Sequence, residues 1–165
     1  MRNQSQDKND DNSNFEWYKL KSTILGVREK KSGGFTIKIT KSEDIKSFTI
    51  LLSKILDYYK YQFMTFDIRG LKHNIKILYE KELRNIGFVV FQEHNYVFQE
   101  RPKVGETVLI AIKPYVGRYE RGQIKRILTS VRYHPRGYKV MLNDKENMIG
   151  RIATIRKENH QKNIK

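Results

Sequence analysis

Residues 104–152 read VGETVLIAIKPYVGRYERGQIKRILTSVRYHPRGYKVMLNDKENMIGRI. Apolar runs in this stretch alternate with turn residues about every ten positions, a spacing typical of short antiparallel β-strands. Nearly every turn carries an arginine or a lysine. The stretch therefore predicts a small, strongly basic β-barrel, and basic charge clustered in this way is typical of nucleic-acid-binding domains.

The net charge of the chain is +15, and it is unevenly distributed. Residues 101–165 hold 16 Lys and Arg against 5 Asp and Glu, which is a net +11, whereas residues 1–100 hold 17 against 13, a net +4. A charge of this size attracts polyanions and speeds association with them, but it does not identify the polyanion. The expected partners are a nucleic acid, with RNA preferred over DNA, or acidic protein partners in a larger complex.

Composition excludes several classes of protein. The chain has no cysteine, so disulfides, a thiolate nucleophile and cysteine metal sites are ruled out. No apolar run approaches the roughly 18 residues of a membrane span, and the amino terminus lacks the apolar core of a signal peptide. We therefore expect an intracellular protein, nuclear or cytoplasmic, with no membrane partner.

Length and an apolar fraction of 38% favour two small cores over a single large one. Residues 1–13 contain only Met1 as an apolar side chain, which predicts a disordered tail because nothing there offsets the entropy of ordering. An α/β domain over 14–99 and the barrel over 100–157 follow, and a basic tail is predicted over 158–165.

Within the first domain the hydrophobic period changes several times. Apolar residues spaced three and four apart predict two helices, with Ser42 as the N-cap of the first and Gly87 as the stop of the second. Aromatic residues such as Trp17 are assigned to the core. The predicted elements are strands at 23–27 and 35–40, a helix over 42–61, a strand at 62–68, a helix over 71–86, and a hairpin of 88–91 and 96–98. This order predicts an α+β class, with a two-layer β-α-β-α-β-β domain carrying both helices on one sheet face.

The barrel stretch carries the pattern of a known family. The matching residues are Val108, Ile110, Gly122, Ile124, Lys125, Ile127, Leu128, Thr129, His134, Pro135, Gly137, Lys139, Val140, Leu142, Gly150, Arg151 and Ile152. Over residues 101–157 the chain thus resembles the small domains of the bacterial YwbE family. The resemblance implies an SH3-like barrel akin to those of translation and transcription accessory proteins, and it supplies a fold more than a biochemical role.

Residues 33–99 show a second similarity. Lys41 follows the first strand of the β-α-β-α-β-β order, and Arg69-Gly70-Leu71-Lys72 leads into the second helix. In these features the segment resembles the Alba family of nucleic-acid-binding proteins, and the resemblance implies that Lys41, Arg69 and Lys72 contact nucleic acid. The alternative for Arg69 is an ion pair with Asp67 or Asp57.

The barrel interleaves cations with tyrosines. Phosphates are bound by cations and unpaired bases by flat apolar rings, so this mixture suits single-stranded or looped RNA. The alternative is a solubilising surface with tyrosines packed at the barrel ends. The predicted contacts in the barrel are Lys113, Arg118, Tyr119, Arg121, Lys125, Arg126, Arg132, Tyr133, His134, Arg136, Lys139 and Arg151.

Catalysis has little support in the sequence. His134 would need a carboxylate or another orienting group for acid–base chemistry, and a turn fixed by Pro135 and Gly137 explains the segment better. The histidines show no metal spacing, and Gly33-Gly34 lacks the length of a phosphate-binding loop. We therefore expect a non-enzymatic RNA-binding protein without cofactor or metal. The alternative is a subunit of a ribonucleoprotein or chromatin assembly whose barrel docks an acidic partner.

Overall fold

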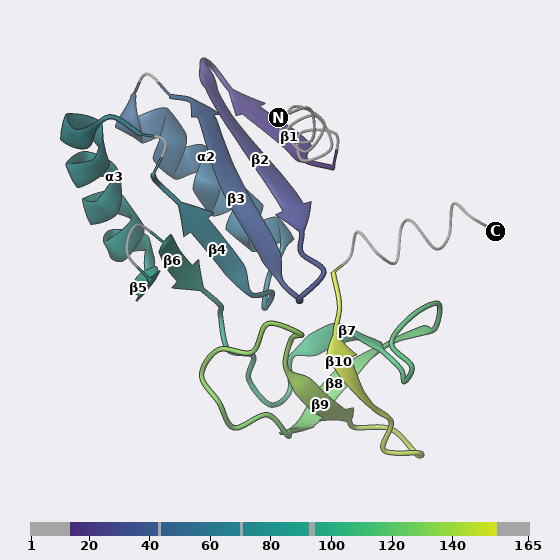
Figure 1. The fold of residues 1–165 in the computed structure, drawn as a ribbon. Helices are drawn as coiled ribbons and strands as arrows, with labels where there is room; N and C mark the ends of the chain where they lie inside the picture. Colours follow the sequence, from purple (N-terminus) through teal and green to yellow (C-terminus); the bar gives the residue numbers. More distant parts are fainter. Residues whose placement is uncertain (1–13, 43, 70, 93–94, 155–165) are drawn as a thin grey trace. The chain divides into compact units, whose positions relative to one another are not determined.

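The computed structural model describes residues 14–42, 44–69, 71–92 and 95–154, and the predicted tails 1–13 and 158–165 lie outside this range. The described chain is a mixed α+β structure with two helices and ten strands in two sheets (Figure 1). Neither helix is long and apolar enough to cross a membrane. The elements are β1 (Glu16–Leu20), β2 (Thr23–Glu29), β3 (Phe35–Lys41), α2 (Ile45–Tyr58), β4 (Met64–Asp67), α3 (His73–Ile86), β5 (Val89–Gln92), β6 (Asn95–Phe98), β7 (Thr107–Ala111), β8 (Tyr119–Ile127), β9 (Lys139–Leu142) and β10 (Ile149–Ile152).

The chain divides into two compact units. The first takes in the chain up to Lys30 together with Phe35–Lys54 and Thr65–Val97. The second takes in Lys31–Gly34, Ile55–Met64 and the chain from Phe98 onward. The unit that contains the barrel is therefore assembled from three separate segments of the sequence.

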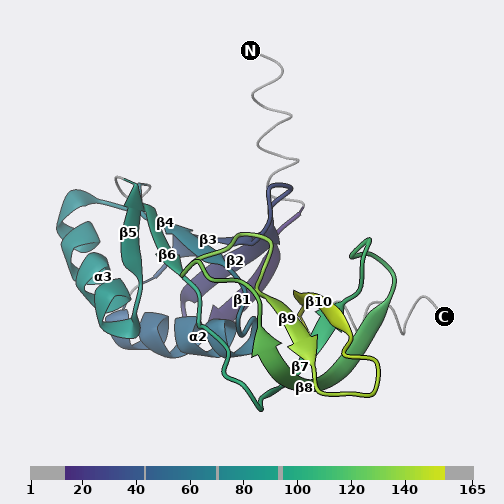
Figure 2. The same cartoon turned by 90° about the horizontal axis from the view of Figure 1, so that it is seen from below.

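The first unit is built on a six-stranded sheet in the order β1-β2-β3-β4-β6-β5. Phe66 on β4 is fully buried, and its ring centroid lies 5.7 Å from that of Phe48 on α2. Phe48 in turn lies 4.5 Å from Tyr79 on α3. Both helices therefore pack on the Phe66 face of the sheet, as the sequence predicted (Figures 1 and 2).

The ends of the helices follow from local hydrogen bonds. Gly87 has φ 126°, and its N–H donates to the carbonyls of Leu83 and Arg84, which confirms it as the stop of α3. The predicted N-cap Ser42 is wrong, because Asp44 Oδ1 accepts the N–H of Ser47 at 2.7 Å and caps α2. This backbone hydrogen bond is also the main cause that lowers the pKa of Asp44.

The sequence did not predict β1, which pairs along its whole length with β2. The assignment of Trp17 to the core was also wrong, because this β1 side chain is 44% exposed. It lies over Gly26 of β2, where an added Cβ would come within 2.7 Å of the indole. An edge strand whose residues alternate between the two faces of a sheet exposes every second side chain on the side that the helices leave uncovered.

The second unit contains the predicted small barrel, closed in the order β10-β7-β8-β9. Gly122 of β8 packs closely against Leu142 of β9, since a Cβ there would lie 2.9 Å from Leu142 Cδ1. Tyr61, from the segment before β4, is 7% exposed and belongs to the barrel core. The other members of this core are Val108, Ile110, Ile124, Tyr138, Val140, Leu142 and Ile152.

Candidate nucleic-acid interface

One row of side chains crosses the outside of the barrel. Lys139 on β9 lies opposite Arg151 on β10, and Arg151 lies opposite Ala111 on β7. Ala111 in turn lies opposite Tyr119 on β8. Directly paired residues of neighbouring strands project to the same face of a sheet. We call these four residues the barrel row: its two cations are direct neighbours, and the buried Ala111 separates Arg151 from Tyr119.

Arg151 is held in place within the barrel row. One of its terminal nitrogens donates to the carbonyl of Gly137 at 2.9 Å, and its guanidinium lies 5.7 Å from the ring centre of Tyr115. A cation at this distance from an aromatic ring is attracted to the ring face. The contact places Tyr115, in the loop between β7 and β8, beside the row.

His134 and Arg136 belong to a turn next to Arg151. The Gly137 N–H donates to the His134 carbonyl at 2.9 Å, and the Arg136 N–H donates to His134 Nδ1 at 3.2 Å, which confirms the predicted turn. Burial lowers the pKa of His134, and the positive charges of Arg151 and Arg136 lower it further. The two arginines are thus close enough to the imidazole to disfavour a third positive charge.

A fully buried glutamine, Gln99, holds this turn by hydrogen bonds to the backbone of His134. Its Oε1 accepts the His134 N–H at 2.7 Å, and its Nε2 donates to the carbonyls of His134 and Tyr61, each at 3.1 Å. Its own carbonyl accepts a hydrogen bond from Arg132 at 2.6 Å. No signal in the sequence points to this role, because an isolated Gln at the end of a strand is equally compatible with exposure.

Two of the predicted cationic contacts serve the fold. The guanidinium of Arg132 bonds the Gln99 carbonyl and Tyr138, and it lies 4.5 Å from the ring centre of Tyr133. Lys125 donates to Asn147 Oδ1 at 3.1 Å, which links β8 to the turn before β10. Arg132 and Lys125 are therefore anchored by the protein itself.

Three further predicted cations of the barrel, Lys113, Arg118 and Arg126, have exposed side chains. Lys113 and Arg118 lie in the loop between β7 and β8, on either side of Tyr115. Arg126 lies opposite Met141 and is separated from Tyr119 along β8 by a break in the register. Of the three, Arg118 is adjacent in sequence to the barrel row.

In the first unit, the structure contains the ion pair that was one alternative for Arg69. Its guanidinium pairs with Asp67, with a closest N–O distance of 2.6 Å. Lys41 is exposed at the end of β3, and Lys72 is exposed immediately before α3, where it makes no side-chain cap.

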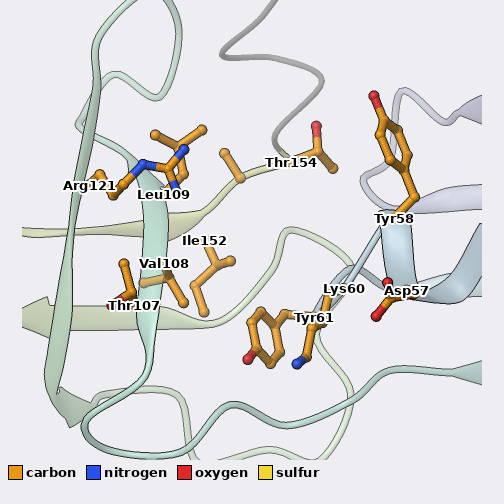
Figure 3. A pocket seen from close by; sticks show the side chains of 11 residues that line it. Asp57, Tyr58, Lys60, Tyr61, Thr107, Val108, Leu109, Arg121, Ile152 and Thr154 are labelled. Atoms are coloured by element: carbon orange, nitrogen blue, oxygen red, sulfur yellow. The ribbon is translucent and has the colours of Figure 1, made fainter.

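A pocket of about 140 Å³ adjoins the barrel row within the second unit (Figure 3). Arg121, which lines it, lies opposite Leu109 and two residues along β8 from Tyr119. Lys60 lies across the pocket beside Tyr61, with its ammonium 5.3 Å from the tyrosine ring centre. The lining residues are Asp57, Tyr58, Lys60, Tyr61, Thr107, Val108, Leu109, Arg121, Ile152, Ala153 and Thr154.

The Tyr61 hydroxyl connects the pocket segment to the barrel. It donates to Glu106 at 2.6 Å, and Glu106 also accepts the Lys103 N–H at 2.6 Å. The bond from Tyr61 is the main cause that lowers the pKa of Glu106, whereas burial is the main cause that raises the pKa of Tyr61. The pair therefore favours an ionised Glu106 and a protonated Tyr61.

We expect Tyr61→Phe to reduce the free energy of unfolding by about 1–3 kcal/mol near neutral pH, because it removes a hydrogen bond to a charged group. A carboxyl with a lowered folded pKa contributes stability above its unfolded pKa and loses it as pH falls through the folded value. The difference between wild type and variant should therefore shrink between about pH 7 and about pH 3 in urea unfolding. A difference that grows on acidification would contradict the assignment.

Within the part of the chain that the structure describes, no three His, Cys, Asp or Glu residues are grouped so as to hold a metal ion. Residues 100–155 match a family model described as an uncharacterized conserved protein (DUF2196), which covers about a third of the chain. Neither the curated proteins nor the solved structures contain a match to the chain. The family description supplies no activity, so the functional argument depends on the geometry of the barrel.

Proposed function

We propose that this protein is a non-enzymatic nucleic-acid-binding protein that binds single-stranded RNA on the outside of its barrel. The observation that carries the proposal is the barrel row, in which Lys139 lies next to Arg151, and Tyr119 follows on the other side of Ala111. Cations beside exposed aromatic rings suit single strands, because phosphates and unstacked bases are then bound together. Unpaired bases are more common in RNA, which favours it over DNA.

The absence of carboxylates at the outward strand positions supports the same proposal. Strand pairing places Glu120 opposite Ile110, whose side chain is buried in the core, so Glu120 is not on the face of Tyr119 and Arg121. Among the described residues, the outward positions of the four strands are Thr107, Leu109, Ala111, Tyr119, Arg121, Gln123, Arg126, Lys139, Met141, Ile149 and Arg151. Leu109 and Ala111 on β7 are buried, so the outward positions of β8, β9 and β10 are the ones suited to a polyanion.

We also infer an SH3-like class for the barrel and an Alba-like class for the first unit. The closure of four short antiparallel strands supports the first, and the order β3-α2-β4-α3-β5-β6 supports the second. The protein would then act inside the cell, in the nucleus or cytoplasm, with Lys41 and Lys72 as additional phosphate contacts.

The test is a titration of the full chain against labelled single-stranded RNA at about 50 mM and about 200 mM salt. We expect binding that weakens steeply with salt, because each phosphate contact releases a counterion. Competition then separates the proposal from the alternative of an acidic protein partner. Unlabelled RNA should displace the label, and an acidic peptide of equal charge should not. The absence of binding at low salt would remove the proposal.

Replacing Tyr119 and Tyr133 with leucine separates base stacking from charge. Alanine changes at stacking positions typically cost about 1–3 kcal/mol per base, and leucine should cost somewhat less because it keeps apolar bulk. We expect weaker binding of single strands, an unchanged salt slope and little change for duplex, as measured by fluorescence anisotropy. Equal losses for single strand and duplex would show that these tyrosines only support the barrel.

A further inference from the structure

A second aromatic and basic surface lies in the first unit, on the sheet face opposite the helices. Leu25 and Val27 of β2 are buried toward the core, so the residues between and beside them point outward. Strand pairing places Trp17 opposite Gly26, and Gly26 opposite Lys38 of β3. These three positions form one outward row across β1, β2 and β3.

Trp17 is displayed in a defined position on this face. The indole lies on the bare backbone of Gly26, where a Cβ would approach Cζ3 to 2.7 Å. The Phe15 ring supports it from one side, with centroids 5.3 Å apart. Because one face of the indole covers Gly26 and 44% of the residue is exposed, the other face is presented to solvent. A flat ring fixed in this way matches the stacking surface that an unpaired base requires.

Positive charge surrounds the two rings. Arg28 and Lys38 lie 4.9 Å and 5.5 Å from the centre of the Phe15 ring. Lys19 and Lys41 are both exposed, and both lie opposite Ile24 in the pairing of the three strands.

The two glutamates of these strands lie on the other face. Glu16 pairs with Val27 and Glu29 pairs with Phe35, and both of those partners are buried toward the core. Among the described residues, the outward positions of β1–β3 therefore carry cations and no carboxylate. The nearest acid on the outward side of β4, Asp67, is held by Arg69.

We propose that this sheet face is a second binding site for single-stranded nucleic acid, with a base stacked on Trp17 and the backbone phosphates held by the surrounding cations. We call it the Trp17 platform: Phe15, Trp17, Lys19, Arg28, Lys38 and Lys41. The proposal rests on the RNA-binding function proposed for the barrel, and it adds a site on the other unit of the chain. Two sites on one chain raise each other's effective concentration, so a strand long enough to reach both binds more tightly than either site alone would allow.

Trp17 is the only tryptophan of the chain, so its fluorescence reports on this face alone. We expect single-stranded RNA to quench it saturably in the full-length protein, with the same midpoint as the anisotropy of labelled RNA. Trp17→Leu should weaken binding by roughly three- to tenfold, which is somewhat less than an alanine change at a stacking position. Trp17→Phe should restore most of the affinity.

Two further variants test the geometry. Gly26→Ala keeps the Trp17 indole but displaces it from its position over residue 26. It should therefore reduce both the quenching of Trp17 fluorescence by RNA and the affinity for RNA. Phe91→Leu is the matched control, since this aromatic side chain of the same unit is 59% exposed on β5, away from the platform, and should leave both unchanged. Circular dichroism of each variant checks the fold. If Trp17→Leu fails to fold, the results for Trp17→Phe and Gly26→Ala decide whether the Trp17 platform binds RNA.

The possible failures of the two proposals can be told apart. RNA that binds by anisotropy without quenching Trp17, and with equal affinity for Trp17→Leu, would overturn the platform and leave the barrel proposal intact. The absence of any binding would overturn both. A quench by acidic peptide as strong as that by RNA would show a docking surface for acidic protein instead of base stacking. The last measurement uses a variant in which the barrel cations are neutralised. If saturating RNA still quenches Trp17 fluorescence in this variant, the Trp17 platform is a site of its own. If the quench is lost, the proposal of a separate site is overturned.

Discussion

Replacing Arg118, Arg136 and Lys139 together with glutamine is expected to weaken single-stranded RNA binding by about a hundredfold near 0.1 M salt. All three side chains lie in or beside the barrel row, and none of them forms a hydrogen bond or ion pair with the described residues. On single strands each phosphate contact contributes about 0.7 to the slope of log affinity against log salt, so the slope should fall by about 2. Anisotropy titrations at several salt concentrations measure both quantities.

The matched control replaces Lys46, Lys54 and Lys81 with glutamine. These lysines are exposed on α2 and α3, and the change lowers the net charge of +15 by the same three units. If binding depends on the local arrangement of the barrel cations, the control should lose only a few-fold in affinity. Equal losses in the two variants would mean that the protein attracts RNA by net charge alone, without a site on the barrel.

The sequence predicted local elements well wherever the signal was local. Apolar spacing located both helices, and Gly87 marked the end of α3 because a residue with positive φ is needed there. The start of α2 was misplaced by two residues, since both Ser42 and Asp44 are good caps and the choice depends on which oxygen reaches the Ser47 N–H. The missing β1 has a different cause, because it is a short edge strand in which the apolar pattern is weak.

Long-range contacts were beyond the sequence. Tyr61 was assigned to the end of a helix, but it packs in the barrel core and bonds Glu106, 45 positions away. Trp17 was assigned to the core because large aromatics usually are, and only the pairing with Gly26 shows why it is displayed instead. The sequence predicts a set of barrel cations, but only the strand register shows that Lys139 and Arg151 share one row.

Gln99→Leu is expected to lower the free energy of unfolding by about 3 kcal/mol or more, which would be the largest effect of any single change considered for this chain. Leucine fits the volume but removes one acceptor and one donor group, so the His134 N–H and the carbonyls of His134 and Tyr61 lose their partner. An unpaired buried polar group costs about 1–3 kcal/mol, and the fully buried site admits little water to replace the bonds.

The same substitution should also loosen the functional surface, since Gln99 holds the turn that places Arg136 and His134 beside Arg151. Chemical denaturation measures the stability, and amide exchange of the His134 N–H measures the turn directly. Gln123→Leu is the control, because this glutamine is exposed on the outside of β8 and should change stability by less than about 0.5 kcal/mol. If Gln99→Leu were as stable as this control and kept the His134 amide protected, the turn would be held by its own backbone bonds, and RNA binding by the variant should then match that of the wild type.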